Sequence, residues 1–309
     1  MKIAMVFPGQ GSQSVGMLKG YAGLPEVDAV RAEAAAVLGD EFVRLLDEGP
    51  AESLNSTVNT QPAMVTAGCA AYRAWVSLGG PKPAVVAGHS LGEYTALVAA
   101  GALQFRDCLP LVRFRAQAMQ EAVPQGQGAM AAILGLEASQ VEQACEEAGG
   151  VVQAVNFNTP EQTVIAGEKA AVERAIEKCK GRGAKRAMPL PVSAPFHSSL
   201  MKPAGERLQG ELQKITITAP LVPLLNNVDV KVETRPDEIR RALVRQASSP
   251  VRWVETVRRM KDEGVTHVVE CGPGKVLAGM VKRISPEMQS LALADRASLE
   301  QALAALKGA

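Results

Sequence analysis

The sequence has few aromatic residues and almost no net charge. Aromatic side chains make up 4% of its 309 residues, and 33 Lys and Arg against 32 Asp and Glu leave a formal charge of +1. Proteins that bind single-stranded nucleic acid stack bases on aromatic side chains, and other nucleic-acid binders carry a basic face. The composition therefore argues against nucleic acid as a partner.

The sequence has few cysteines, and their spacing does not suggest pairs. The five cysteines are an odd number, are widely separated and include no C-x-x-C pair. This pattern predicts neither a disulfide framework nor a zinc site and favours a reducing compartment. We therefore expect a cytoplasmic protein with no metal and no other cofactor.

Long hydrophobic runs are also missing. The apolar run at residues 1–7 is stopped by Pro8 and Gly9. It is too short for the core of a signal peptide or for a membrane span. We predict a buried strand at residues 2–7 and no association with a membrane.

Short apolar runs alternate with helical periodicity in the first part of the chain, and the pattern resumes in the last part. Runs at 84–88 and 266–270 predict buried strands, and a helix is expected from about Leu91. Other helices are predicted at 24–38, 40–48, 60–78, 198–213, 236–246 and 250–263. Continuous apolar strands separated by helices indicate a parallel sheet covered on both faces. The fold class is α/β, with an α/β-hydrolase-like large domain formed by residues 1–124 and 196–309.

The middle of the chain has a different order of elements. Strands are expected at 128–134, 151–156, 162–167 and 184–190, with helices at 138–148 and 168–181 and a turn at 158–161. The order β-α-β-β-α-β is the ferredoxin-like arrangement. We predict an inserted small ferredoxin-like domain at residues 125–195.

A G-x-S-x-G pattern at residues 88–92 points to a nucleophile. It follows a predicted strand and precedes a predicted helix, the context in which a sharp turn exposes the serine hydroxyl. Unpaired N–H groups at the helix start can stabilise an oxyanion. The alternative is that Ser90 only caps the helix. The strand before it and the helix after it favour the nucleophile.

The chain has three histidines, and His197 is the best candidate for the base. His267 lies in a predicted strand, and His89 adjoins Ser90 on a tight turn, so it is better suited to supporting the turn or lining the cleft. His197 lies in a loop, a common place for catalytic residues. The group that orients its imidazole stays open: Glu270, Asp295 and a carbonyl near Gln246 are all possible.

Five segments resemble those of a known family. They occur in the same order as in that family, and the resemblance covers essentially the whole chain. They are Phe7-Pro8-Gly9-Gln10-Gly11-Ser12-Gln13, Gly88-His89-Ser90-Leu91-Gly92-Glu93-Tyr94, Arg113-Phe114-Arg115-Ala116-Gln117-Ala118-Met119, Phe196-His197-Ser198 and Glu270-Cys271-Gly272-Pro273-Gly274. Together they resemble the malonyl-coenzyme A:acyl carrier protein transacylases of bacterial type II fatty acid synthesis.

The resemblance implies a reaction and its catalytic groups. A malonyl group passes from coenzyme A to Ser90, and then to the phosphopantetheine thiol of an acyl carrier protein. His197 acts as base and then as acid, oriented by the backbone carbonyl of Gln246. The family's oxyanion hole corresponds to the N–H groups of Gln10 and Leu91.

The resemblance also implies residues that bind the substrate. Arg115 shares one row of a predicted helix at 107–121 with Leu111 and Met119, and a guanidinium in that setting needs an anionic partner. The family supplies the malonyl carboxylate. The alternative is an ordinary arginine that reaches solvent. Phe196 resembles the bulky residue of members that select malonyl.

Other polar residues are weaker candidates for the cleft. His89, Asn156, Asn158 and Gln162 could line it, the last three against the pantetheine arm, although these three could equally be turn residues. The pair 226–227 could border the pocket. A basic cluster could guide an acidic carrier protein, or could be an ordinary solvated face; it consists of Lys178, Lys180, Arg182, Lys185 and Arg186.

Other functions remain open from the sequence. An esterase or thioesterase would use the same serine and histidine, and a catalytically inactive carrier-docking module would have the same fold. A trans-acting acyltransferase of polyketide synthesis is a further alternative. We expect a monomer that binds malonyl-coenzyme A and an acyl carrier protein.

Overall fold

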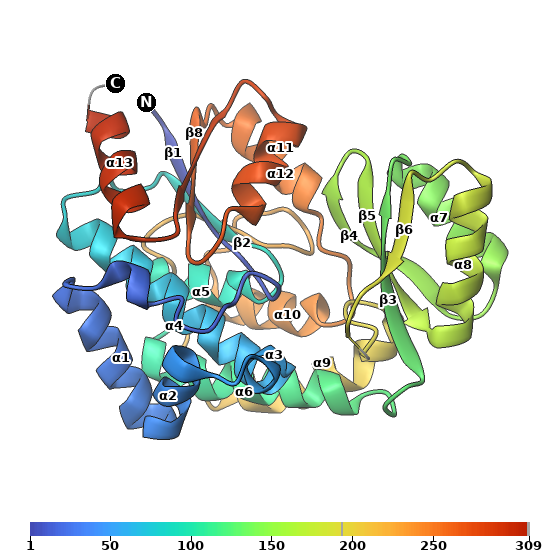
Figure 1. The fold of residues 1–309 in the computed structure, drawn as a ribbon, viewed down its shortest axis with the longest axis horizontal. Helices are drawn as coiled ribbons and strands as arrows, with labels where there is room; N and C mark the ends of the chain where they lie inside the picture. Colours follow the sequence, from blue (N-terminus) through green and yellow to red (C-terminus); the bar gives the residue numbers. More distant parts are fainter. Residues whose placement is uncertain (193, 308–309) are drawn as a thin grey trace.

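The computed structural model describes residues 1–192 and 194–307. They form an α/β structure with two separate sheets, one of five strands and one of four. Figure 1 shows the smaller sheet with its helices on the right, beside the larger α/β body that holds both chain termini. The chain enters the smaller body after α6 (Phe105–Glu121) and leaves it before α9 (Lys202–Gln213), so the residues of the smaller body are contiguous in sequence.

The larger sheet is parallel, with strand order β7-β2-β1-β8-β9. Its strands are β1 (Ile3–Phe7), β2 (Val85–Gly88), β7 (Leu224–Leu225), β8 (His267–Cys271) and β9 (Gln289–Leu293). All residues of β1 and β2 are buried, as expected for strands covered on both faces. β1 is central, so its C-terminal end lies among the loops that carry the site.

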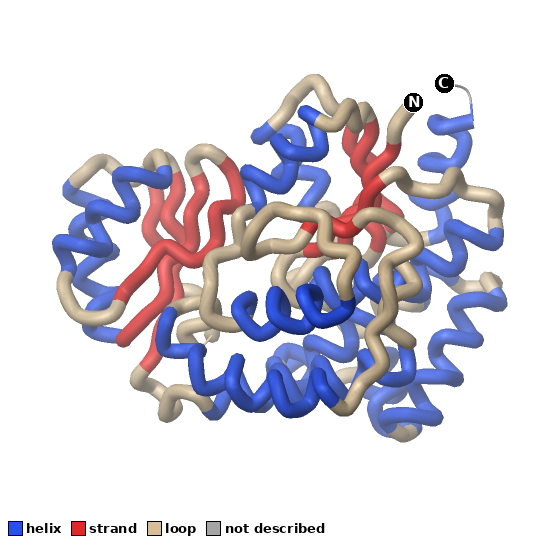
Figure 2. The backbone as a smooth tube through the Cα atoms, turned by 180° about the vertical axis from the view of Figure 1, so that it is seen from behind, coloured by secondary structure: helices blue, strands red, loops and turns tan. Residues whose placement is uncertain are grey.

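Helices cover both faces of this sheet (Figure 2). They are α1 (Pro25–Leu38), α2 (Asp40–Glu48), α3 (Ala51–Asn55), α4 (Thr57–Ser77), α5 (Gly92–Ala99), α6 (Phe105–Glu121), α9 (Lys202–Gln213), α10 (Pro236–Gln246), α11 (Trp253–Asp262), α12 (Val276–Ile284) and α13 (Arg296–Lys307). Alternate residues of β1 sort into two cores. Met5 and Phe7 pack with residues of α1, α4 and α5, whereas Ala4 and Val6 pack with those of α11 and α12.

The smaller sheet is antiparallel, with order β4-β5-β3-β6. Its strands are β3 (Gly128–Leu134), β4 (Val152–Thr159), β5 (Gln162–Glu168) and β6 (Arg186–Pro189). Helices α7 (Ala138–Ala148) and α8 (Lys169–Gly181) pack on one face. The other face, with Met130 and Val164, packs on Val192 and Phe196 beside the site. This is the ferredoxin-like arrangement predicted from the order of elements.

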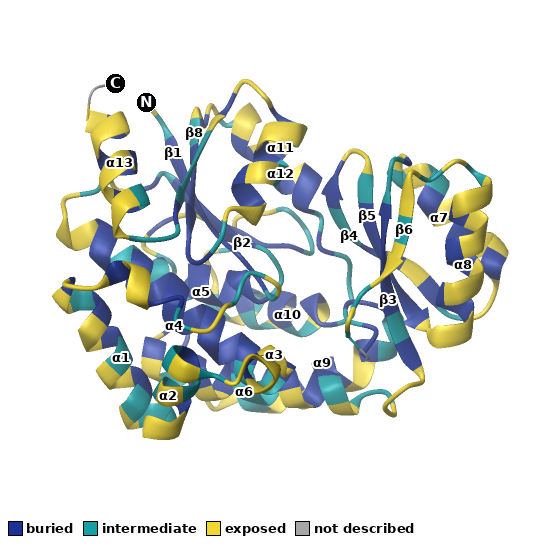
Figure 3. Cartoon of the chain, in the orientation of Figure 1, coloured by how far each residue is buried: buried dark blue, intermediate teal, exposed yellow. Residues whose placement is uncertain are grey.

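Most predicted elements are confirmed, and their outer faces are the exposed ones (Figure 3). Some predicted bounds differ from the structure, and one strand was missed. β4 continues to Thr159, because its last residues pair with Gln162 and Thr163, so the turn predicted at 158–161 is shorter. β9 was not predicted, because this edge strand is mostly half-exposed and lacks a continuous apolar run.

Candidate active site

The G-x-S-x-G segment forms a sharp turn between β2 and α5. Ser90 has φ of 51°, a left-handed conformation that few non-glycine residues adopt. A Cβ atom at Gly88 would lie 1.9 Å from the carbonyl carbon of Gly92, and one at Gly92 would lie 2.0 Å from the carbonyl oxygen of Phe7. Side chains cannot fit at either position. The two glycines therefore let the turn close against β1 and present Ser90.

Ser90 and His197 meet, although 107 positions separate them in the chain. The Ser90 hydroxyl lies 2.6 Å from Nε2 of His197, and Nδ1 of the same ring lies 2.9 Å from the backbone carbonyl oxygen of Gln246. The carbonyl can only accept, so Nδ1 carries the proton and Nε2 is the acceptor for the hydroxyl. The geometry is that of a serine paired with a neutral imidazole.

The surroundings of His197 keep its ring neutral. The side chain is buried, and burial followed by the nearby Arg115 guanidinium lowers the pKa of His197 to about 3. The side chains of Glu270, in β8, and Asp295, the two acids considered from the sequence, contact the starts of helices instead. Oε2 of Glu270 accepts the N–H of Ala278 in α12, and Asp295 accepts from Ser298 in α13. The group that contacts Nδ1 is the peptide carbonyl of Gln246.

Arg115 projects from α6 toward Ser90 and is only 2% exposed. Its Nη2 lies 3.3 Å from Ser90 Oγ and 2.9 Å from Oε1 of Gln246, and its Nη1 lies 2.9 Å from Oε1 of Gln61. Its guanidinium carbon lies 5.2 Å from the centroid of the Tyr94 ring. Within the described residues it forms no ion pair with a carboxylate. A buried cation held only by neutral groups is suited to an anionic ligand.

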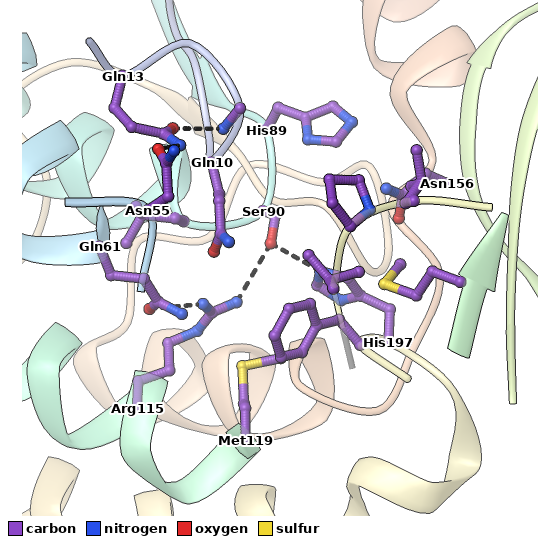
Figure 4. A pocket seen from close by; sticks show the side chains of 17 residues that line it. Gln10, Gln13, Asn55, Gln61, His89, Ser90, Arg115, Met119, Asn156 and His197 are labelled. Atoms are coloured by element: carbon purple, nitrogen blue, oxygen red, sulfur yellow. Dashed lines mark hydrogen bonds between the residues drawn. The ribbon is translucent and has the colours of Figure 1, made fainter. Parts of the chain in front are cut away.

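A cavity of about 570 Å³ opens at Ser90, and Figure 4 shows it from close by. Arg115 and Gln61 lie on one side of the serine and His197 on the other. The apolar part of the wall is formed by Met119, Met130, Leu190, Val192 and Phe196. The cavity thus pairs one charged end with an apolar wall.

Several residues expected from the sequence line this cavity. Gln10, Leu91, His89 and Phe196 all do so. In the part of the chain that the structure describes, the backbone N–H groups of Gln10 and Leu91 donate to no acceptor. His89 donates from Nε2 to Oδ1 of Asn158 over 2.8 Å. Two N–H groups beside Ser90 therefore remain available for a ligand oxygen.

The hairpin residues of the small sheet are placed differently from one another. Asn156 lines the cavity, and its buried Oδ1 has no partner among the described residues. Asn158 is buried behind His89. Gln162 begins β5, opposite Thr159 and Leu134, and is not a lining residue.

Three further polar residues hold the site together, and the sequence analysis gave none of them this role. Gln61, from α4, binds Arg115. Asn227 does not border the cavity but lies beneath the turn, where its Oδ1 accepts the N–H of Ser90 and its Nδ2 donates to the carbonyl of Gly88. Glu93 is buried and accepts from Asn227 and Gln246. For Gln61 in α4 and Glu93 in α5, the sequence signal that could have found them is a polar residue in a largely apolar helix.

Residues 1–192 and 194–307 contain no group of three or more His, Cys, Asp or Glu side chains that could hold a metal ion. None of the helices described in this range is long and apolar enough to cross a membrane.

Comparison with known proteins defines the class. The family model described as "Acyl transferase domain" matches residues 4–302, and the chain is an acyltransferase. It is 55% identical over 305 residues to the malonyl CoA-acyl carrier protein transacylase of Escherichia coli K12, covering 98% of this chain and 99% of that one. The chain belongs to the malonyl CoA-acyl carrier protein transacylase family.

Solved structures agree with this assignment. The acyl-carrier-protein S-malonyltransferase of Burkholderia pseudomallei 1710b superposes with a TM-score of 0.97 at 59% identity, covering 98% of this chain and all of that one. A malonyl-transacylase in complex with a type II PKS acyl-carrier protein gives a TM-score of 0.97 at 50% identity, covering 99% and 100%.

Proposed function

We propose that this protein transfers the malonyl group from malonyl-coenzyme A to the phosphopantetheine thiol of an acyl carrier protein, in fatty acid biosynthesis. The observation that carries the proposal is the guanidinium of Arg115, which lies 3.3 Å from Ser90 Oγ and lacks a carboxylate partner among the described residues. A malonyl group on Ser90 would bring its free carboxylate to that cation. The names of the relatives support the same substrates.

The first half-reaction loads the serine. His197 takes the hydroxyl proton at Nε2 while Ser90 Oγ attacks the thioester carbonyl. The N–H groups of Gln10 and Leu91 stabilise the oxyanion of the tetrahedral intermediate. The carbon–sulfur bond then breaks, and protonated His197 returns its proton to the sulfur of coenzyme A. A malonyl-serine ester and a neutral imidazole remain.

The second half-reaction unloads the serine by the same steps in reverse. The carrier thiol gives its proton to His197, and its sulfur attacks the malonyl-serine carbonyl. The ester bond breaks, and His197 returns the proton to Ser90 Oγ. The Nδ1 contact with the Gln246 carbonyl keeps the ring in place through both half-reactions.

Selectivity and the pantetheine arm follow from the cavity wall. Arg115 holds the malonyl carboxylate, and Phe196 crowds a branch at the α-carbon. His89, Asn156 and Asn158 are our candidates on the pantetheine side, because His89 and Asn156 line the cavity and Asn158 accepts a hydrogen bond from Nε2 of His89. Gln162 belongs to this proposal only as a support of the hairpin, since it pairs within the small sheet.

We further propose that residues 125–195, a range that includes Ser193 outside the described residues, act as an inserted domain between the two parts of a catalytic domain, 1–124 and 196–309. Met130, Asn156 and Leu190 of this insertion contribute to the cavity wall. Such a wall excludes water while admitting a thiol arm, which favours transfer over hydrolysis.

A surface for the carrier protein is part of the proposal. In the basic cluster defined above, Lys180, Arg182 and Lys185 are paired with surface carboxylates. Lys178 and Arg186 form no ion pair with the described residues. We propose that the cluster guides an acidic carrier, and malonyl transfer should then weaken with added salt. Salt-independent kcat/KM for the carrier would contradict this.

The test of the function is a burst experiment without carrier protein. Malonyl-coenzyme A should release about one equivalent of coenzyme A per site, because the acyl-serine waits for a thiol. Mass mapping should find the malonyl group on Ser90. Continuous release would favour a hydrolase, and an unlabelled Ser90 would favour a docking module. Transfer to carriers of polyketide synthesis is a second candidate, favoured by the complex of a relative with such a carrier. We also propose a cytoplasmic monomer that uses neither a cofactor nor nucleic acid.

A further inference from the structure

A buried carboxylate lies behind the site without reaching the cavity. Glu93 is 2% exposed and is not among the residues that line the cavity. Its Oε2 accepts two hydrogen bonds, from the backbone N–H of Asn227 at 3.0 Å and from Nε2 of Gln246 at 2.8 Å. The mechanism above uses neither contact.

The contact with Gln246 fixes the orientation of its side-chain amide. Nε2 of this amide donates to Glu93 and to the Ser90 carbonyl, at 3.0 Å, so Oε1 faces Arg115. If the amide were turned over, its NH2 group would meet the guanidinium, where donor would face donor. Glu93 and the Ser90 carbonyl therefore together set which end of the amide Arg115 meets.

The contact with the backbone N–H of Asn227 fixes the segment beneath the nucleophile. Asn227 is fully buried, and its side chain bonds both to the N–H of Ser90, at 2.8 Å, and to the carbonyl of Gly88, at 2.6 Å. These two bonds span the turn whose Ser90 has a positive φ. The Glu93 carboxylate anchors the backbone of Asn227 and thus one side of this brace.

We propose that Glu93 is a positioning residue for malonyl specificity, and that its acceptor oxygen holds Arg115 on the serine through the amide of Gln246. The proposal rests on the proposed function, because it needs a substrate carboxylate at Arg115. Glu93 does not contact Arg115 itself, so its carboxylate does not compete with the substrate carboxylate for the edge of the guanidinium that faces Ser90. The Gln246 amide lies between Glu93 and Arg115. It orients the guanidinium and keeps the Glu93 carboxylate apart from the malonyl carboxylate.

The acceptor oxygen rather than the negative charge makes the contacts. Burial raises the pKa of Glu93 to about 7, so the acid and its anion are both accessible near neutral pH. The carbonyl oxygen of a protonated carboxyl group can still accept both N–H bonds. A glutamine at this position offers the same acceptor, whereas an alanine leaves two buried donors without it.

The experiment compares Glu93→Ala with Glu93→Gln by the ratio of kcat/KM for malonyl-coenzyme A to that for acetyl-coenzyme A. Loss of a buried acceptor should lower this ratio at least about tenfold in Glu93→Ala. Glu93→Gln should stay within about threefold of the parent ratio, since it restores the acceptor. If Glu93 had a merely structural role, its loss would lower kcat/KM equally for both substrates and leave the ratio unchanged. An unchanged ratio in Glu93→Ala, or a Glu93→Gln ratio as low as that of alanine, would overturn the proposal.

Gln246→Met gives a second route if Glu93→Ala does not fold. It removes the amide and keeps the peptide carbonyl that contacts His197. The malonyl-to-acetyl ratio should again fall about tenfold, and an unchanged ratio would overturn the proposal. Measuring the parent protein in the same assay distinguishes a failure of the proposed function from a failure of the proposed role of Glu93. A parent that does not transfer malonyl refutes the proposed function, whereas an active parent with unmoved variants refutes only the role of Glu93.

Discussion

The imidazole of His197 is oriented by a peptide carbonyl, with Nδ1 2.9 Å from the backbone oxygen of Gln246. A carbonyl accepts the Nδ1–H bond without bringing a negative charge to the ring. A carboxylate there would lie close to Arg115, because the side chain of the same Gln246 binds that guanidinium. A neutral orienting group therefore leaves the cation available to an anionic acyl group.

Arg115→Ala should separate malonyl from acetyl transfer. Removal of a buried, charge-assisted contact should lower kcat/KM for malonyl-coenzyme A about a hundredfold, while the acetyl value falls little or rises. Steady-state assays with both thioesters measure this. Arg113→Ala is the matched control, because Arg113 lies on the same helix but stacks on Phe42 away from the serine. Equal losses for both acyl groups would argue against the carboxylate contact.

Gly88→Ala should prevent the turn at Ser90 from forming. The added Cβ would lie 1.9 Å from the Gly92 carbonyl carbon, and backbone atoms on both sides leave no room to relax. We expect more than about 3 kcal/mol of lost stability, seen as low soluble yield or a strongly lowered Tm. Gly210→Ala in α9 is the control, because a Cβ there meets nothing within 4 Å. A Gly88→Ala protein with the parent Tm would contradict this packing argument.

The pH dependence of serine acylation should lack a limb at the ordinary histidine pKa. Burial and Arg115 lower the pKa of His197 to about 3, so the ring remains neutral and able to accept a proton above that pH. The rate of Ser90 acetylation by acetyl-coenzyme A should be flat from about pH 5 to about pH 8. Arg115→Ala removes one of the causes and should move the acid limb upward. A parent limb near about pH 6.5 would show an unshifted histidine.

Glu270 should make the stability of the protein fall as pH rises. Burial raises the pKa of its carboxyl from 4.5 to about 7, so the native state holds this proton more tightly than the unfolded state. Its contribution is complete below pH 4.5 and is lost as pH rises toward 7. Relative to Glu270→Gln, the parent should lose up to about 3 kcal/mol of unfolding free energy across this range.

Urea unfolding at about pH 5 and about pH 8 measures the effect of Glu270. Glu52→Gln is the control, because it makes the same substitution at an exposed position. If parent and Glu270→Gln respond equally to pH, the buried carboxyl does not titrate as described.

Much of the fold could be predicted from local sequence patterns. The strand at 128–134 and the helices at 138–148 and 236–246 begin and end where periodicity and flanking residues predict. The edge strand β9 escaped prediction because its residues are only partly buried, and hydrophobic periodicity reports burial. The segment 250–263 became the shorter α11, because Val251 pairs with β4 of the other sheet instead.

The site divides in the same way. The pattern at 88–92 is a local fact, because glycine at two fixed positions is what the turn demands, and this much the sequence decided alone. The partner of Nδ1, the lack of a carboxylate beside Arg115 within the described residues, and the brace of Glu93 and Asn227 depend on contacts between residues 49 to 153 positions apart. Such contacts follow from strand order and helix packing, which periodicity does not encode. The tertiary structure therefore decided which polar groups surround the serine.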